Sequence, residues 1–229
     1  YCPALLVQPE RAEKEAEDTY RPVVIVGGHR EETKEFEEQL AEWTRTSLPG
    51  VYLRIVSLLH GPTASEEERA EEYAYRLMLP LHKQIERACE VIESDEHLRD
   101  GFDLIGIGMG GILARGYVQS CNAPPVKTLI TYNSPHAGCK KQAEEDVQKL
   151  FTSHPDLWKR QDPYLPFVQS FVSSAGVHLD PNRRHLYHSN ASLLPDLNLQ
   201  RNQEKFHPLD TLDKLILIFG GADNATDPQ

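Results

Sequence analysis

Five short runs of apolar, mostly β-branched residues constrain the fold of this chain more than any other feature of its sequence. The runs are residues 22–26, 51–57, 103–107, 126–132 and 214–220. Apolar residues that follow one another without alternation are typical of a strand buried on both faces. Segments with a helical pattern separate the first four runs. We therefore predict an α/β fold: a mostly parallel sheet with helices on both faces.

The segments between the runs show the spacing of amphipathic helices. In residues 31–46, Phe36, Leu40 and Trp43 form one apolar stripe on an otherwise charged surface. Residues 66–93 repeat the pattern, and Pro80 should kink or divide that helix because proline cannot donate the helical hydrogen bond. The stripe of this second helix consists of Tyr73, Leu77, Leu81, Ile85 and Cys89.

Residues 134–212 have a different character. Prolines interrupt short amphipathic pieces, and no run there compares with the five predicted strands. No linker of the Gly/Ser type sets the stretch apart as an independent domain. We therefore predict a helical insertion, or cap, within a single domain of residues 21–229, preceded by an acidic arm of residues 1–20.

Charge and cysteine content exclude several classes of function. The chain has 24 Lys+Arg against 35 Asp+Glu, a net charge of −11, whereas a nucleic-acid-binding protein needs a basic face. No apolar run approaches the ~20 residues of a transmembrane helix, so we expect no transmembrane segment. The four cysteines include no CxxC pair, and we expect neither a metal site nor a cofactor.

The glycine-rich turn after the third predicted strand is the most informative segment. A buried strand that runs into a small-residue turn and then into an apolar helix is the setting of a nucleophile elbow, Gly-x-Ser-x-Gly. Here the residues are Gly106-Ile107-Gly108-Met109-Gly110, so the position of the nucleophilic serine is Gly108.

Two other interpretations of these glycines stay open. Gly106, Gly108 and Gly111 fit the Gly-x-Gly-x-x-Gly pattern of dinucleotide-binding sites. Such a site normally follows the first strand and has an acidic residue about 20 positions on, whereas Thr128 stands there. Alternatively, the glycines only allow a helix to pack closely on a strand.

From about residue 21 to residue 228 the sequence resembles palmitoyl-protein thioesterases, lysosomal α/β-hydrolases that remove fatty acyl groups from cysteine. The matching segments follow one another in a single order, which is more specific than the glycine turn alone. They are residues 22–28, Leu48-Pro-Gly-Val-Tyr52, residues 106–111, Val168-Gln169, Asp180-Pro181, residues 187–200 with Ser192-Leu-Leu-Pro-Asp-Leu-Asn198, and residues 214–228.

The resemblance implies an α/β-hydrolase fold with a damaged catalytic site. Gly108 stands at the nucleophile position, and Met109 and Gly28 would supply the backbone on the oxyanion side. In the first turn, Gly27-Gly28 stands where the family has a His-Gly pair. Asp223 would be the remaining acid of the triad, and the histidine would lie beyond residue 229. The leading hypothesis is therefore a thioesterase-like pseudoenzyme, a structural or accessory subunit of a larger assembly whose protein partner the sequence does not name.

The first alternative is an active acyl-thioester hydrolase with a relocated nucleophile. Histidines that could serve as its base lie at predicted strand ends or in nearby loops, at His29, His60 and His136. Ser134 and Cys139 follow a strand end and are candidate nucleophiles. No pairing of these residues is apparent from their spacing.

The second alternative is a fatty-acyl-binding protein. The resemblance places an acyl groove along the helix of the insertion, although an apolar stripe at helical spacing is also what a core helix shows. The predicted lining is Leu165, Phe167, Val168, Phe171 and Val172.

The cysteines and two short motifs bear on the compartment. The resemblance implies a disulfide between Cys89 and Cys121, with two buried thiols as the alternative; Cys139 has only Cys2 left as a partner. Two triplets fit the N-glycosylation pattern: Asn190-Ala-Ser192 and Asn224-Ala-Thr226. Together they favour a secretory or lysosomal lumen, with an assembly in another organelle, such as the mitochondrion, as the alternative.

Overall fold

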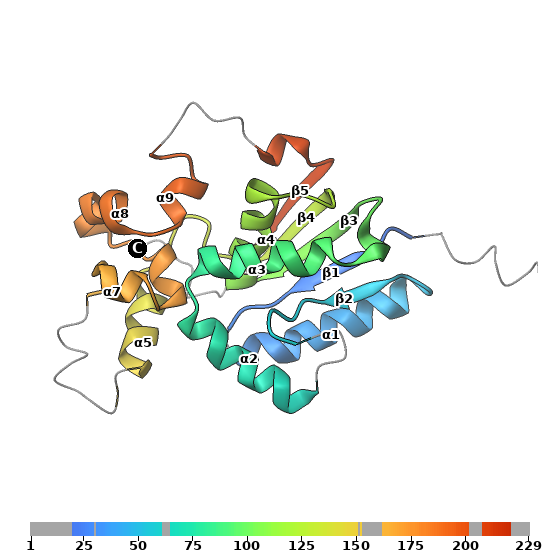
Figure 1. Cartoon of the computed structure of the whole chain (residues 1–229), viewed down its shortest axis with the longest axis horizontal. Helices are drawn as coiled ribbons and strands as arrows, with labels where there is room; N and C mark the ends of the chain where they lie inside the picture. The colour runs from blue at the N-terminus through green and yellow to red at the C-terminus, as the bar shows by residue number, and fades with distance from the viewer. Residues whose placement is uncertain are drawn as a thin grey trace, which may run out of the picture.

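The computed structural model describes residues 20–29, 31–60, 65–150, 152, 162–201 and 208–220. Within these ranges five strands form one parallel sheet, in the order β2-β1-β3-β4-β5 (Figure 1). Each predicted run contains one strand, which confirms the α/β class. The strands are β1 (Val23–Val26), β2 (Leu53–Ile55), β3 (Phe102–Ile107), β4 (Val126–Tyr132) and β5 (Lys214–Ile218).

Helices cover both faces of this sheet. Helix α1 (Glu31–Ser47) packs on one face, and α3 (Leu81–Glu93) and α4 (Met109–Ser120) pack on the other (Figure 1). Alternate residues of β1 pack on opposite faces of the sheet. Val23 and Ile25 belong to the apolar cluster under α1, and Val24 and Val26 belong to the apolar cluster under α3 and α4. None of the described helices combines the length and the apolar composition needed to cross a membrane.

The predicted division at Pro80 is confirmed. Helix α2 (Glu66–Met78) ends before Leu79, and α3 begins at Leu81. A proline disfavours the helical conformation of the residue before it, so the break falls at this position. The start of α2 is a capping box, in which Ser65 and Glu68 each accept a hydrogen bond from the other's backbone N–H.

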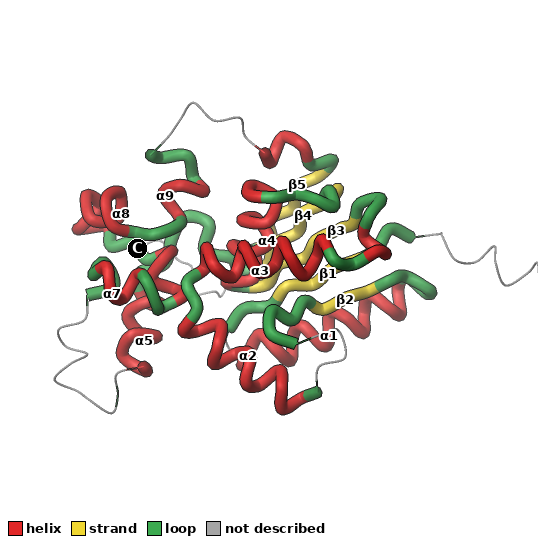
Figure 2. Tube along the Cα trace, viewed as in Figure 1, coloured by secondary structure: helices red, strands yellow, loops and turns green. Residues whose placement is uncertain are grey.

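Between β4 and β5 the described residues form helices, short 3₁₀ turns and loops, and no strand (Figure 2). This part lies beside the carboxyl ends of the parallel strands, where α/β folds place their functional sites (Figure 1). The helical character predicted for the insertion is thus confirmed where it is described. Its helices are α5 (Lys141–Leu150), α7 (Pro166–Gln169), α8 (Arg184–Asn190) and α9 (Leu194–Leu197).

Two expectations about burial are wrong. The run at 214–220 was expected to be buried on both faces, but the apolar side chains of β5 are 36% to 48% exposed. Strand β5 is at the edge of the sheet, and no described residue pairs with its outer side. Trp43, expected on the buried stripe of α1, is 53% exposed, and its ring touches Phe36 edge-on.

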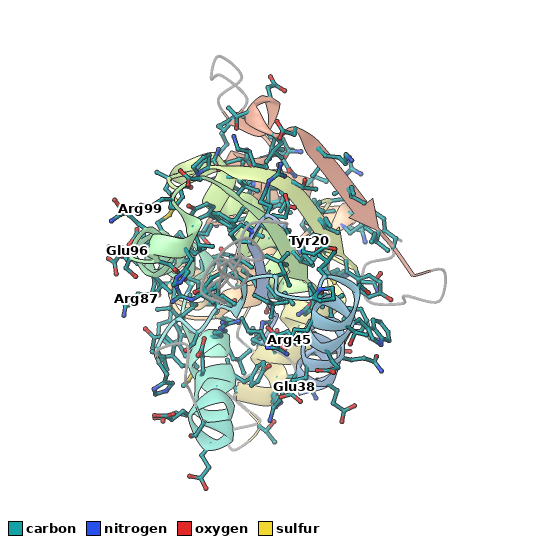
Figure 3. The ribbon with its side chains drawn as sticks, turned by 90° about the vertical axis from the view of Figure 1, so that its right-hand side faces the viewer. Tyr20, Glu38, Arg45, Arg87, Glu96 and Arg99 are labelled. Atoms are coloured by element: carbon teal, nitrogen blue, oxygen red, sulfur yellow. A yellow bond between two sulfur atoms is a disulfide. The ribbon has the colours of Figure 1, made fainter. Side chains whose placement is uncertain are left out.

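The end of the molecule opposite the insertion is charged. Figure 3 looks onto this end, where Arg87, Glu96 and Arg99 project from the surface. Glu96 and Arg99 form an exposed ion pair with an N–O distance of 3.0 Å. Exposed pairs of this kind contribute little to stability.

Candidate functional site

The turn between β3 and α4 has the backbone of a nucleophile elbow. Strand β3 ends at Ile107 and α4 begins at Met109, so Gly108 alone reverses the chain. Its φ of 57° and ψ of −123° lie in a region that strains any residue with a side chain. The Gly108 N–H donates to the carbonyl of Tyr132 in β4, at 2.8 Å. The sharp strand-to-helix turn is present, and the residue at its apex is glycine.

The glycines of this turn differ in how closely they are packed. A Cβ on Gly110 would overlap the carbonyl oxygen of Val26, and one on Gly111 would overlap the hydroxyl of Ser134. At Gly108, by contrast, a Cβ would have one heavy-atom neighbour within 4 Å, Thr33 Cγ2 at 3.7 Å. Close packing therefore explains Gly110 and Gly111 but not Gly108.

The backbone of Met109 lies close to the first turn. A Cβ on Gly28 would lie 3.4 Å from the Ile107 carbonyl oxygen and 3.5 Å from the Met109 nitrogen. Met109 is the first residue of α4, so its N–H has no carbonyl four residues earlier to bind within the helix. The Met109 N–H and the first turn thus lie side by side, an arrangement that can stabilise an oxyanion.

A buried ion pair holds the first turn in place. Arg76 and Glu72, one turn apart on α2, are joined at 2.7 Å with almost no exposure. The Arg76 guanidinium also donates to the carbonyl oxygens of Gly27 (2.9 Å) and Val56 (2.7 Å), which follow β1 and β2. Glu72 in turn accepts from the Leu58 N–H at 2.7 Å. Helix α2 therefore fixes the ends of both strands beside the elbow.

The side-chain space at Gly27 is filled from α1. The Glu37 carboxylate lies against the Cα of Gly27, and a Cβ there would overlap it. Glu37 is buried, and its Oε2 accepts from the Tyr73 hydroxyl at 2.9 Å. Where the resemblance expects a histidine at position 27, the space thus holds a hydrogen-bonded carboxylate from another element.

A buried histidine–carboxylate pair lies directly after this turn. His29 Nε2 and Asp146 Oδ2 are 3.0 Å apart, and both side chains are less than a tenth exposed. Asp146 belongs to α5, so the pair connects the first turn to the insertion.

Ser134, His136 and His60, which were also considered as substitutes, contact other groups. The Ser134 hydroxyl donates to the Tyr132 carbonyl at 3.3 Å. His136 Nε2 is 2.9 Å from the Thr131 hydroxyl oxygen, and burial, reinforced by the Arg115 charge, lowers the His136 pKa to about 4. His60 lies 3.8 Å from Glu68, and Cys139 is buried. Nor do three His, Cys, Asp or Glu side chains gather as a metal site within the described ranges.

The predicted acyl-groove residues divide into two sets. Val168 and Val172 are fully buried in a cluster with Val147 of α5. Phe167 is 60% exposed, and its ring lies 5.4 Å from that of the half-buried Phe171. Helix α7 ends at Gln169, so Phe171 and Val172 lie beyond the helix that was expected to carry them. A groove here would involve the phenylalanines rather than the valines, and it stays a prediction.

A sequence model of the family described as palmitoyl protein thioesterase matches residues 22–229. The chain belongs to this family. It is 28% identical over 214 residues to Palmitoyl-protein thioesterase 3 of Dictyostelium discoideum, covering 91% of this chain and 68% of that protein. It is 27% identical over 198 residues to Palmitoyl-protein thioesterase 1 of Caenorhabditis elegans, covering 86% and 61% of the two chains. It is 24% identical over 220 residues to Lysosomal thioesterase PPT2 of Rattus norvegicus, covering 92% of this chain and 66% of that protein. The chain thus spans 61% to 68% of the length of these palmitoyl protein thioesterase relatives.

The disulfide that the thioesterase family implied is confirmed, since Cys89 and Cys121 join the ends of α3 and α4. Asn190 is exposed at the end of α8, where its amide donates to the Tyr164 carbonyl at 3.2 Å. Three predicted residues lie outside the described ranges, and their roles stay predictions: Asp223, Asn224 and Cys2.

The sequence did not reveal the polar contacts around the first turn of this thioesterase fold. Glu72 and Arg76 stand four residues apart, but that spacing is typical of exposed helix pairs. His29 and Asp146 are 117 residues apart, and no local pattern connects them.

Proposed function

We propose that this chain is a palmitoyl-protein-thioesterase-like pseudoenzyme that serves as a structural or accessory subunit of a larger assembly. The observation that carries the proposal is Gly108, which has no side chain at the apex of an otherwise preserved elbow. Acyl transfer by a triad begins with attack by the elbow side chain. Without it, oxyanion donors and binding retain only a small part of the rate enhancement.

The first turn supports the same proposal. The Glu37 carboxylate fills the space that a side chain at position 27 would occupy, and it accepts a hydrogen bond from Tyr73. If a single recent substitution had removed the nucleophile, the neighbouring residues of the site would still be those of an active enzyme. Here a second position of the site is also altered, and its space is filled by a hydrogen-bonded group.

The test is hydrolysis of a palmitoyl thioester by the purified chain. We expect no turnover above that of the heat-unfolded protein, and no labelling by a fluorophosphonate probe. Turnover that the Asp223→Asn substitution abolishes would overturn the proposal. Gly108→Ser is the matched gain-of-function variant. Labelling of this variant alone would show that the elbow can present a serine and that the missing side chain limits the chemistry.

The alternative of an active acyl-thioester hydrolase is favoured by one observation, the buried His29–Asp146 pair beside the turn. In many acyl-transfer sites the general base is an imidazole that a neighbouring carboxylate orients. This alternative predicts thioester hydrolysis that His29→Gln abolishes and that His60→Gln leaves unchanged. Equal rates in both variants would exclude His29 as the base.

The fatty-acyl-binding alternative is favoured by the exposed ring of Phe167 next to Phe171. It predicts that palmitate binds the delipidated protein and that Phe167→Ser weakens binding. Trp43→Ser is the matched control, because Trp43 is similarly exposed but lies on α1. The alternative fails if palmitate does not bind or if the two variants bind it equally.

We propose a secretory or lysosomal lumen as the compartment, as the name of the rat relative suggests for that protein. The Cys89–Cys121 disulfide supports an oxidising environment. Expression in a secretory cell should add a glycan at Asn190 that endoglycosidase removes and that Asn190→Gln prevents. A chain that reaches mitochondria instead, without a glycan, would favour the organellar assembly.

A further inference from the structure

Strand β5, at the edge of the sheet, carries apolar side chains on both of its faces. They begin a run of five consecutive residues, called here the edge patch: Leu215, Ile216, Leu217, Ile218 and Phe219. Each is between 36% and 56% exposed, and β5 is the outermost strand, pale red in Figure 3. Contiguous exposed apolar side chains on a folded protein often mark an interaction surface.

The register with β4 assigns the residues of β5 to the two faces of the sheet. Leu215 lies beside Leu129, which belongs to the apolar cluster under α3 and α4. Ile218 lies beside Tyr132, which packs against the cluster under α1. Register partners share a face, and successive residues of a strand alternate between faces. The odd-numbered residues of β5 are therefore on the α3/α4 face, and the even-numbered apolar residues are on the α1 face.

On the α1 face the apolar surface is wider than the strand. The Tyr132 ring, next to Ile218, stacks on the ring of Phe36 with centroids 4.7 Å apart. The Phe36 ring in turn touches Trp43 edge-on at 6.5 Å, and Trp43 is 53% exposed. Apolar side chains thus continue from the edge of the sheet to α1.

The outer side of β5 is open to another strand. Within the part of the chain that the structure describes, no residue pairs with the backbone on that side. Natural edge strands are usually protected from further pairing by a charged residue, a proline or a bulge. Residues 215–219 include neither a charged residue nor a proline, and the pairing with β4 runs without a register shift. Strand addition at such an edge is a common mode of recognition.

The edge patch itself has the composition that a pairing strand needs. Because residues 215–219 are apolar on both faces, a strand that pairs with them must also be apolar on both faces. A second copy of β5 is such a strand. A two-fold interface uses the same surface from both copies, so that surface has to be self-complementary.

An antiparallel pair of β5 strands, centred on Leu217, brings the whole edge patch of one copy against that of the other. Leu215 then lies opposite Phe219, and Ile216 lies opposite Ile218. Opposite residues come from the same face of the sheet, because their numbers differ by an even amount. Each apolar side chain of the patch therefore meets another apolar side chain.

Area and charge are compatible with this arrangement. At the exposures given above, two edge patches present on the order of 1,000 Å², about the area that a specific interface must bury. Lys214 lies opposite Gly220, so no like charges meet along residues 214–220. The net charge of −11 on each chain opposes the approach of two copies, and salt screens this repulsion. The expected complex is a weak dimer that salt strengthens.

We propose that this chain forms a two-fold dimer through β5, in which the two sheets join into one continuous sheet. The interface is two strands away from β3 and the turn at Gly108. The proposal therefore does not depend on whether that turn is catalytic. It names the surface through which the chain associates, and its partner is a second copy of the chain.

Sedimentation velocity of the full chain tests the proposal at concentrations from about 1 to 100 µM, the range expected for a weak interface. We expect monomers at the low end and dimers at the high end, with a larger dimer fraction at higher salt. Hydrogen exchange at the two ends of this range should show that the amides of residues 214–219 gain protection on dimerisation. The amides of β2, the other edge strand, should not change.

A charge at the centre of the interface should separate the two copies. Leu217→Lys sets two like charges opposite each other, which should raise the dissociation constant about tenfold or more. Met78→Lys is the matched control, because Met78 on α2 is 47% exposed, against 48% for Leu217. The control should dimerise as the wild type does. A mixture of Leu217→Lys and Leu217→Glu chains should form dimers again, because opposite charges then meet.

The proposal is overturned if the chain stays monomeric at the highest concentration, or if Leu217→Lys and Met78→Lys dimerise equally. A monomer whose β5 amides are already protected at the lowest concentration would show that the same chain covers its own edge. Assemblies that grow beyond dimers would equally exclude the proposal, since a two-fold contact closes on itself. If Leu217→Lys does not fold, the exchange of the wild type decides alone: unchanged β5 amides would exclude the interface.

Discussion

The Glu37 carboxylate occupies the space that a side chain on Gly27 would need, and Tyr73 holds it there through a 2.9 Å hydrogen bond. Gly27→His must therefore displace a buried carboxylate. Overpacking of this kind costs about 1–3 kcal/mol, which urea denaturation can measure. The double variant Gly27→His/Glu37→Ala should recover part of the loss. A Gly27→His protein as stable as the wild type would show that Glu37 moves freely.

Gly108 and Gly110 should respond differently to the same added methyl group. Gly110→Ala drives a Cβ into the backbone carbonyl of Val26, which cannot move without distorting β1. Gly108→Ala meets only Thr33, and its cost is backbone strain at positive φ, on the order of 1–3 kcal/mol. We expect Gly110→Ala to lower the melting temperature much further. The reverse order would contradict the packing described for the turn.

The Arg76–Glu72 pair should be far more important for stability than an exposed pair. Arg76→Met leaves the buried Glu72 carboxylate without its cation, a change that typically costs about 3–5 kcal/mol. The matched control is Lys83→Met, whose partner Glu86 is exposed and should leave the free energy of unfolding nearly unchanged. Equal effects in the two variants, measured by denaturant titration, would mean that burial does not distinguish the pairs.

Removing the disulfide should loosen the packing of α3 on α4. Cys89 and Cys121 close a loop with a sequence separation of 32, and loss of such a bond costs about 2–4 kcal/mol. The variant Cys89→Ala/Cys121→Ala should therefore melt at a lower temperature than the oxidised wild type. Reductant should lower the melting temperature of the wild type but not of the variant, and a reductant effect on both would point to another cause.

Local patterns predicted most of the fold. The five apolar runs each contain a strand, and the helix division at Pro80 follows from proline's missing N–H. The same patterns misjudged the burial of β5 and Trp43, because an apolar side chain is buried only where another element covers it. At the site, the elbow and the position of Gly108 could be read from the residues, whereas the contacts around Gly27 and His29 could not.

The sequence by itself determined the succession of strands and helices along the chain, because that succession depends on neighbouring residues and on backbone propensity. It also determined that residue 108 has no side chain. Only the tertiary structure decided what surrounds that position. It leaves space above Gly108, fills the space at Gly27 with Glu37, and joins His29 to Asp146. These features are contacts between residues far apart in the chain, which exist only after the helices have packed on the sheet.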